Sequence, residues 1–273
     1  MALKFMYITN RPETAVIAQR HGVDRIWIDL EVKGKEKRQK GLDSVKSHHK
    51  LSDISSIKTV LTTSELLVRI NPWDEESEKE INNVLDLGAD LIMLPMWKKA
   101  SEVQAFIQAV GGRAKTVLLL ETREAVECLD RILGIPGIDE IHIGLNDLHL
   151  SYGMSFMFEL LADGIVEEII KKIRALGIPY GFGGIARIGQ GELPAENIII
   201  EHYRLGSTRV ILSRTFCNAD SVSSQKELDK LFCEEMRKVR DLEETVKNYD
   251  DEMFENNRRY VVRAVEQIVK RRK

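Results

Sequence analysis

Two short apolar runs, Thr116-Val-Leu-Leu-Leu120 and Ile141-His-Ile143, each lead directly into an acidic side chain. The first run is followed by Glu121, and the second by the segment Gly144-Leu-Asn-Asp147. An acid at the end of a buried strand is costly to desolvate unless something pairs with it. The two acids are 26 residues apart, about one strand–helix–strand step, so we expect them side by side at one end of a parallel sheet. Oxygen ligands in that arrangement suit a divalent cation.

The rest of the chain repeats this alternation of strand and helix. Near-continuous apolar segments alternate with segments of helical periodicity, which indicates a parallel sheet covered on both faces. The predicted strands are Phe5–Ile8, Arg25–Asp29, 65–70, Asp90–Pro95, Lys115–Leu120, Glu140–Gly144, Pro179–Gly183 and Arg209–Ser213. Eight strand–helix units close a barrel, so we predict the α/β class and a (β/α)8 TIM barrel with extra C-terminal helices. An open doubly wound sheet is the competing architecture, but no glycine-rich turn follows the first strand.

The predicted barrel divides the chain into two parts. Residues 1–216 form the predicted catalytic barrel domain. Residues 217–273 are highly charged and carry apolar side chains at helical spacing, and they exceed what one closing helix needs. We expect this helical extension to pack on the barrel or on a neighbouring subunit, and we expect a homo-oligomer.

Composition narrows the classes of function. The 273 residues are 43% hydrophobic and 30% charged with a net charge of −3, so no electrostatic footprint for nucleic acid is visible. No run approaches the roughly 20 apolar residues of a membrane span. The three cysteines are an odd number without metal-ligand spacing, which predicts free thiols in a reducing cytoplasm. We therefore expect a cytoplasmic protein that binds a small molecule, with no nucleic acid or membrane as partner.

Other charged residues near strand ends extend the predicted site. Arg69 interrupts an apolar segment, and a buried guanidinium needs a carboxylate partner. It could bind an anionic substrate, or it could form an internal ion pair with Glu121 or Asp29. Asp29 ends the second strand, where it could assist the site or cap a loop. For Glu121 and Asp147 the alternatives are a helix cap and an ion pair with a nearby lysine or arginine.

The glycine-rich segment Gly181-Phe-Gly-Gly-Ile-Ala186 matches the dinucleotide pattern G-x-G-x-x-A. It lies on the seventh predicted strand, and no helix opens directly after it, so the match is weak. We favour glycines that let a substrate or a neighbouring backbone approach closely. A phosphate site near strands seven and eight is the alternative.

Four segments together resemble the HpcH/HpaI aldolase and citrate lyase β-subunit family. They are Ile28-Asp-Leu-Glu31, Leu67-Val-Arg-Ile-Asn71, Gly88-Ala-Asp-Leu-Ile-Met-Leu-Pro-Met96 and Glu121–Leu148. The resemblance implies a (β/α)8 barrel, Mg²⁺ or Mn²⁺ as cofactor, and reversible carbon–carbon cleavage through a pyruvate-like enolate of a 2-oxo acid. It places the metal ligands at Glu121 and Asp147, the substrate arginine at Arg69 and the second-strand aspartate at Asp29.

The resemblance leaves the exact reaction open. We expect a metal-dependent aldolase or lyase, with Gly144 and Asn146 as further substrate-binding residues. The motif Asp29-Leu-Glu31 is more similar to the citrate lyase branch of the family, so an acyl-thioester lyase resembling citrate lyase or malyl-CoA lyase is an alternative. A catalytically silent member that binds a small acid is another.

One departure from the resemblance concerns the general base. The aldolase branch has a histidine where this chain has Val32, and retro-aldol cleavage needs a group that takes a hydroxyl proton. A water activated by the metal is one substitute, because a bound cation lowers the pKa of water. The other is His48 or His49, which an insertion at residues 33–50 brings near the second strand.

Overall fold

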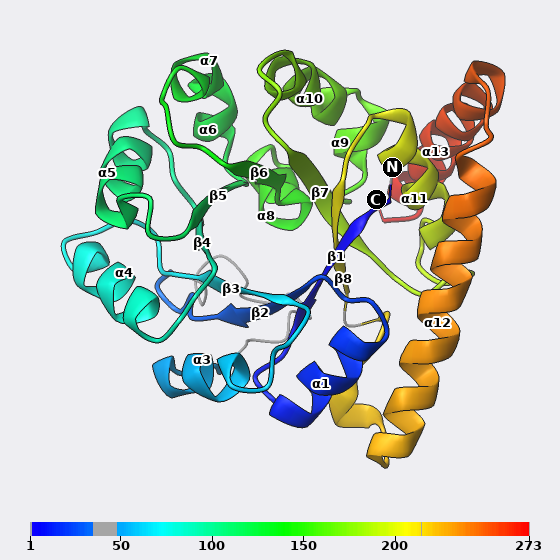
Figure 1. Cartoon of the computed structure of the whole chain (residues 1–273). Helices are drawn as coiled ribbons and strands as arrows, with labels where there is room; N and C mark the ends of the chain where they lie inside the picture. Colours follow the sequence, from blue (N-terminus) through cyan, green and yellow to red (C-terminus); the bar gives the residue numbers. More distant parts are fainter. Residues whose placement is uncertain (1, 35–47, 214, 273) are drawn as a thin grey trace.

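Eight parallel strands form a closed barrel in which neighbours in sequence are neighbours in space and β8 pairs with β1 (Figure 1). The computed structural model describes residues 2–34, 48–213 and 215–272. The strands are β1 (Lys4–Ile8), β2 (Arg25–Asp29), β3 (Glu65–Arg69), β4 (Leu91–Leu94), β5 (Lys115–Leu120), β6 (Glu140–Ile143), β7 (Tyr180–Ile185) and β8 (Arg209–Leu212). The predicted α/β barrel is confirmed.

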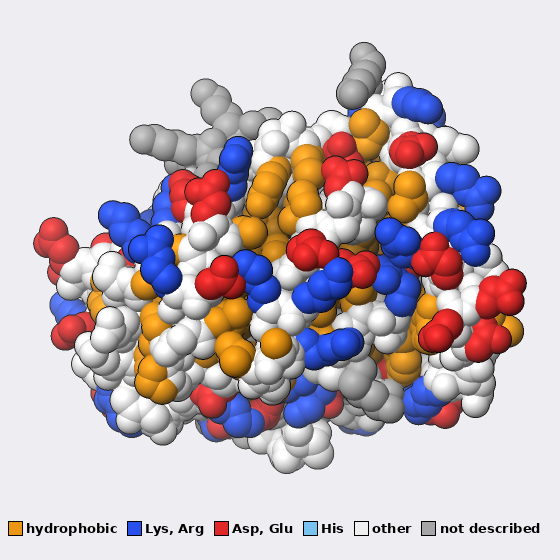
Figure 2. Space-filling model, turned by 90° about the horizontal axis from the view of Figure 1, so that it is seen from above, with side chains coloured by type: hydrophobic (Ala, Val, Ile, Leu, Met, Phe, Trp, Pro, Cys, Tyr) orange, Lys and Arg blue, Asp and Glu red, His pale blue; other side chains and the backbone are white. Residues whose placement is uncertain are grey.

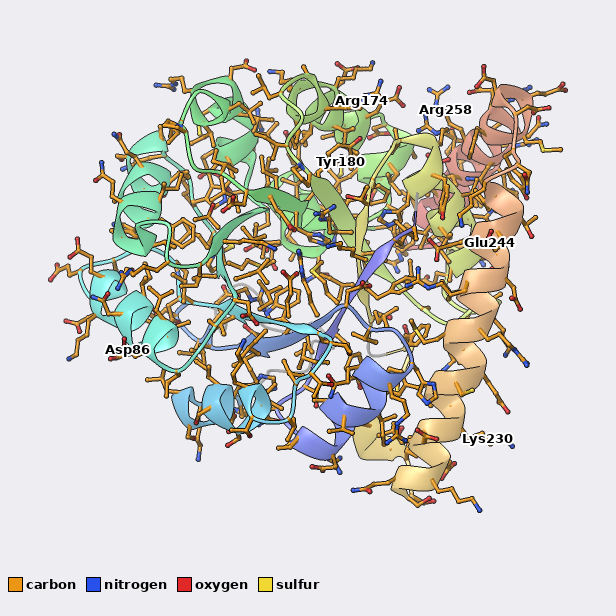
Figure 3. The ribbon with its side chains drawn as sticks, in the orientation of Figure 1. Asp86, Arg174, Tyr180, Lys230, Glu244 and Arg258 are labelled. Carbon is orange, nitrogen blue, oxygen red and sulfur yellow. The ribbon has the colours of Figure 1, made fainter. Side chains whose placement is uncertain are left out.

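Helices surround the barrel and cover its outer face (Figure 1). They are α1 (Pro12–Arg20), α3 (Leu51–Lys58), α4 (Ser77–Asp86), α5 (Ala100–Val110), α6 (Arg123–Glu127), α7 (Leu129–Leu133), α8 (Leu145–Ser151), α9 (Glu159–Ala162), α10 (Ile165–Ala175), α11 (Ala195–Arg204), the 3-10 turn Ala219–Ser221, α12 (Gln225–Val246) and α13 (Asp251–Arg272). Charged side chains such as Asp86, Lys230 and Glu244 lie on the outer rim (Figure 3). Figure 2 shows both signs of charge interspersed with hydrophobic side chains on one face.

Two pairs of short helices follow one another where the backbone leaves helical geometry. Helices α9 and α10 are separate, because Gly164 between them has a φ of 78°. The segment 123–133 forms α6 and α7, which meet at Cys128. Arg11 is the N-cap residue of α1, and Pro12 begins its first turn.

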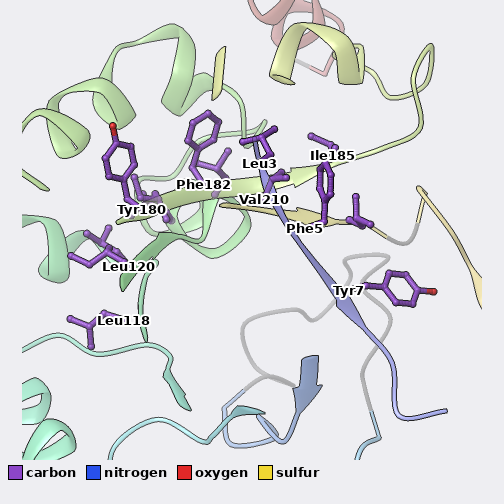
Figure 4. Packing of buried hydrophobic residues seen from close by; sticks show 14 of the residues in the cluster. Leu3, Phe5, Tyr7, Leu118, Leu120, Tyr180, Phe182, Ile185 and Val210 are labelled. Atoms are coloured by element: carbon purple, nitrogen blue, oxygen red, sulfur yellow. The ribbon is translucent and has the colours of Figure 1, made fainter. Parts of the chain in front are cut away.

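The strands are buried on both faces, which explains their near-continuous apolar sequences. In β5, Leu118 and Leu120 belong to the cluster that packs against the helices (Figure 4). Val117 and Leu119 belong to a second cluster, inside the barrel. This alternation follows from the period-2 direction of strand side chains. The inner cluster is completed by residues of β1 to β4: Met6, Trp27, Leu67, Leu91 and Met93.

A network of ion pairs fills the barrel at the N-terminal end of the strands. Both terminal nitrogens of Arg25, which is 1% exposed, donate to the Glu140 carboxylate at 2.6 Å. Nε and Nη2 of Arg209 donate to the same carboxylate at 3.1 Å. Glu65 accepts from Nε of Arg25 at 3.0 Å and from Nζ of Lys115 at 2.7 Å. Each of these residues begins its strand, so barrel closure brings them together.

Two glycines of β7 make room for neighbouring parts of the chain. A Cβ atom at Gly181 would lie 2.3 Å from the carbonyl oxygen of Arg209 on β8. A Cβ at Gly183, whose φ is 52°, would lie 2.8 Å from Cδ1 of Leu145. Close approach of other parts of the chain therefore accounts for two glycines of the dinucleotide-like segment.

The two long C-terminal helices pack against the barrel of their own chain. Helix α12 contacts α1 and α11, and α13 contacts α9 and α11 (Figure 1). The end of α12 is tied to the start of β1, because Glu243 accepts a hydrogen bond from the backbone N–H of Leu3 at 2.7 Å. Among the described residues, no helix is both long enough and apolar enough to cross a membrane.

Candidate active site

A cavity of about 650 Å³ opens at the C-terminal end of the barrel strands. Its volume lies within the range of small-molecule sites, roughly 300–1,000 Å³. Its walls include every residue predicted for the site: Asp29, His48, His49, Arg69, Glu121, Gly144, Asn146 and Asp147. Parallel strands present their carboxyl ends at one face, so side chains far apart in the sequence converge there.

Glu121 follows β5 and is 3% exposed. Its Oε1 atom accepts a hydrogen bond from the backbone N–H of Met96 at 3.1 Å. Met96 has a φ of 54°, a conformation that is uncommon for residues other than glycine. Gly144, directly after the neighbouring strand β6, has no side chain; a Cβ atom there would lie 2.9 Å from both Cβ and Oε2 of Glu121. A backbone N–H therefore holds one oxygen of the Glu121 carboxylate, and the missing side chain of Gly144 leaves space beside the other. Thr122, not Glu121, caps α6.

The electrostatics of this end of the barrel are dominated by acids. Burial, followed by repulsion from the Asp147 carboxylate, raises the pKa of Glu121 well above its ordinary value, although Arg69 acts in the opposite direction. Asp147 itself lies in the first turn of α8 and is partly exposed. Two carboxylates that repel each other in a buried site are stabilised by a cation between them.

The donor set fits a divalent ion that prefers oxygen ligands. Among the described residues, no group of three or more His, Cys, Asp or Glu side chains is arranged to hold a metal. Glu121 and Asp147 would therefore supply two carboxylates. Mg²⁺ is commonly bound by one or two carboxylates, with water and substrate oxygens completing its shell.

Arg69 is fixed by two acids of the second strand and its loop. Nε and Nη2 donate to the two carboxylate oxygens of Asp29, each at 2.8 Å, and Nη1 lies 3.2 Å from Oε2 of Glu31. The guanidinium also lies over the Trp27 ring, 5.2 Å from its centroid. Burial lowers the pKa of Arg69, but the charges of Asp29 and Glu31 outweigh that effect and raise it above its ordinary value. The internal ion pair to Asp29 is formed, and Arg69 still lines the cavity.

The two histidines differ in their surroundings. Nδ1 of His49 accepts a hydrogen bond from the backbone N–H of Asp29 at 3.0 Å, whereas His48 is exposed at the cavity wall. Because Nδ1 of His49 accepts, the proton of its neutral ring is on Nε2. Most of the predicted insertion at 33–50 lies outside the described residues. Val32 is 58% exposed, and its backbone N–H donates to Asn71 at 3.0 Å.

Three residues of the cavity neighbourhood were not predicted from the sequence to serve the site. Trp27 supports Arg69, Met96 donates its N–H to Glu121, and His142 lines the cavity wall. Trp27 and His142 lie inside apolar strands whose sequence predicts core residues. The role of Met96 depends on its backbone conformation. The only local signal was that His142 interrupts an apolar strand.

Comparison with known proteins identifies relatives in sequence and in structure. The 2-keto-3-deoxy-L-rhamnonate aldolase of Shigella dysenteriae is 29% identical, over 41% of this chain and 54% of that protein, so the match spans about half the length of this relative. A solved HpcH/HpaI aldolase/citrate lyase family protein from Burkholderia cenocepacia is 14% identical with a TM-score of 0.59, covering 90% of this chain and 95% of that one. The citrate synthase SbnG is 18% identical with a TM-score of 0.57, covering 78% and 87%.

The two structural likenesses concern the fold alone. The sequence model of the HpcH/HpaI aldolase/citrate lyase family matches residues 5–180, which include Asp29, Arg69, Glu121 and Asp147. This chain belongs to the HpcH/HpaI aldolase/citrate lyase family.

Proposed function

We propose that this protein is a divalent-metal-dependent lyase that makes or breaks a carbon–carbon bond of a 2-oxo acid. The observation that carries the proposal is the buried Glu121 carboxylate, which faces Asp147 and lies near the fixed guanidinium of Arg69. The name of the Shigella relative, a 2-keto-3-deoxy acid aldolase, supports a 2-oxo acid as the substrate class.

Glu121 and Asp147 would hold Mg²⁺ or Mn²⁺. The bound cation would supply Lewis acidity at the keto oxygen of the substrate. The N–H of Met96 keeps one oxygen of Glu121 oriented, and Gly144 leaves space beside the other. Gly144 and Asn146, both in the cavity wall, would contact the substrate from the same side.

Arg69 would bind the substrate and stabilise negative charge that develops on its oxygen. Its fixed orientation matters because a donor held in place before reaction costs no reorganisation when charge appears. Asp29 supplies that orientation through two hydrogen bonds to Arg69. We therefore assign Asp29 the role of a positioning residue, since its carboxylate oxygens are both engaged by the guanidinium.

His48 and His49 are the two side chains that would take part in proton transfer. His49 accepts a hydrogen bond from the backbone N–H of Asp29 and lies in the cavity wall, where it would contact the substrate. His48 or a cavity water would accept the hydroxyl proton. Replacing His48 by alanine should lower kcat by about 10²–10⁴ if His48 is the base. A kcat retained in that variant would assign the proton to water, and His49→Ala, assayed alone, measures the contribution of His49.

The metal proposal is tested by calorimetry with Mn²⁺. Glu121→Gln and Asp147→Asn should each weaken Mn²⁺ binding while circular dichroism stays unchanged. Glu124→Gln is the matched control, because that carboxylate is exposed and pairs with Lys98 at 2.8 Å. Unchanged affinity in both site variants would end the proposal.

The reaction itself is tested by turnover. Oxaloacetate or a 4-hydroxy-2-oxo acid should release pyruvate with Mg²⁺ and stop doing so with EDTA. Cleavage of an acyl thioester alone would instead support the citrate lyase-like alternative. Binding of a 2-oxo acid without any turnover would support a catalytically silent member.

We also propose a two-part organisation, with residues 1–216 as the catalytic barrel and 217–273 as a helical extension. The packing of α12 and α13 on α1, α9 and α11 supports it. A homo-oligomer and a cytoplasmic location, the latter supported by three free cysteines, complete the proposal.

A further inference from the structure

Two side chains in the cavity wall have buried polar atoms that find no hydrogen-bond partner in the part of the chain that the structure describes. His142 and Trp27 both line the cavity, and each is 2% exposed. Among the described residues, neither Nδ1 of His142 nor Nε1 of Trp27 has a hydrogen-bond partner. Leaving a buried polar group unpaired is costly, so such atoms beside a cavity indicate a ligand that completes them.

The chemistry of the missing partner follows from the tautomer of His142. Its Nε2 lies 3.1 Å from the carbonyl oxygen of Gly183, and a carbonyl can only accept, so Nε2 carries the proton. Burial lowers the pKa of His142 to about 4, so the ring is neutral near neutral pH. Nδ1 is therefore a hydrogen-bond acceptor, whereas Nε1 of Trp27 can only donate.

Both side chains point into the barrel. They lie one layer of strand residues deeper than the groups proposed to bind the carboxylate end of the substrate. His142 pairs in register with Leu119 of β5, two residues before Glu121. Trp27 precedes Asp29 by two residues, and its ring lies beneath Arg69. A ligand held by Arg69 would therefore extend its remaining atoms toward Trp27 and His142.

We propose that His142 and Trp27 form a subsite for a hydroxyl group on the part of the substrate remote from its carboxylate. A carboxylate or carbonyl oxygen can only accept, so it cannot satisfy Nδ1 of His142. A hydroxyl both donates and accepts, and it can therefore satisfy either atom. This subsite rests on the proposed lyase function, and it makes His142 a specificity-determining residue for the aldehyde partner.

The kinetic test compares two aldehydes that differ by one hydroxyl. The Mg²⁺-loaded protein condenses pyruvate with glycolaldehyde or with acetaldehyde, and kcat/KM is measured for each. We expect a preference for glycolaldehyde of about tenfold or more, because a site built to bind a hydroxyl rejects the analogue that lacks it. His142→Phe should abolish most of that preference, whereas His142→Gln should retain part of it through its amide oxygen.

A second readout does not depend on turnover. The ¹⁵N resonance of His142 Nδ1 should shift when 4,5-dihydroxy-2-oxopentanoate, the aldol of pyruvate and glycolaldehyde, is added to the Mg²⁺-loaded protein, and it should stay unchanged with 4-hydroxy-2-oxopentanoate, the aldol of pyruvate and acetaldehyde. If neither aldehyde reacts, the proposed function fails while this titration still tests the subsite, because the hydroxylated acid is then not consumed. An unchanged aldehyde preference in His142→Phe, or equal resonance shifts with both acids, would overturn the subsite.

Discussion

Replacing Glu140 by glutamine should destabilise the barrel strongly at neutral pH and less in acid. Glu140 is 5% exposed and accepts hydrogen bonds from Arg25 at 2.6 Å and from Arg209 at 3.1 Å. Burial raises the pKa of Glu140, but the hydrogen bonds and charges of the two arginines outweigh it and lower that pKa from 4.5 to about 2. At roughly 1.4 kcal/mol per pH unit, this difference corresponds to about 3 kcal/mol of folding free energy.

The pH dependence follows from the sign of the shift. The folded-state pKa is depressed, so the stabilisation is fully present above pH 4.5 and is lost as the pH falls toward 2. Glutamine does not titrate, so the difference in the free energy of unfolding between the wild type and Glu140→Gln should decrease as the pH falls from 4.5 toward 2. Urea unfolding at pH 7, 4 and 3, followed by circular dichroism, measures this difference.

A matched control distinguishes the loss of the buried Arg25–Glu140–Arg209 ion pairs from the loss of any single carboxylate charge. Glu124→Gln removes an exposed carboxylate that pairs with Lys98, and it should change stability by no more than about 0.5 kcal/mol. A Glu140→Gln variant as stable as the control at pH 7 would refute the reasoning. A difference that grows between pH 7 and pH 3 would refute the assigned direction of the pKa shift.

The remaining predictions concern the site and the assembly. Gly144→Ala should weaken Mn²⁺ affinity in calorimetry, since the added Cβ would lie 2.9 Å from Glu121. Gly134→Ala is the control and should bind Mn²⁺ as the wild type does, because its Cβ would meet only a carbonyl oxygen, at 3.5 Å. Asp29→Asn should raise the KM for the 2-oxo acid about tenfold or more with a smaller effect on Mn²⁺ binding, because Arg69 loses its fixed orientation; equal losses of both would contradict a positioning role. Light scattering at micromolar concentration should give a mass above 31.2 kDa, and a strict monomer would contradict the expected homo-oligomer.

Much of the architecture could be predicted because its signals are local. Each strand is a short, largely apolar run, and segments of helical periodicity separate these runs, so the number and order of strands can be counted along the chain. Parallel strands place their carboxyl ends at one face, which is why Glu121 and Asp147 could be expected together. The helix boundaries were less predictable. The break at Gly164, for example, depends on how α9 and α10 pack, and a helical pattern continues through it.

The sequence by itself determined the barrel class, the strand-end acids and the presence of a charged residue in an apolar strand. Only the tertiary structure decided which partners these residues have. Arg69 meets Asp29 across 40 positions, and Arg25 meets Glu140 across 115, because barrel closure makes distant strand residues neighbours. The tautomer of His142 was likewise decided by the carbonyl of Gly183 on the next strand. Hydrogen-bond geometry, burial and pKa depend on these spatial neighbours, which cannot be inferred from local sequence patterns.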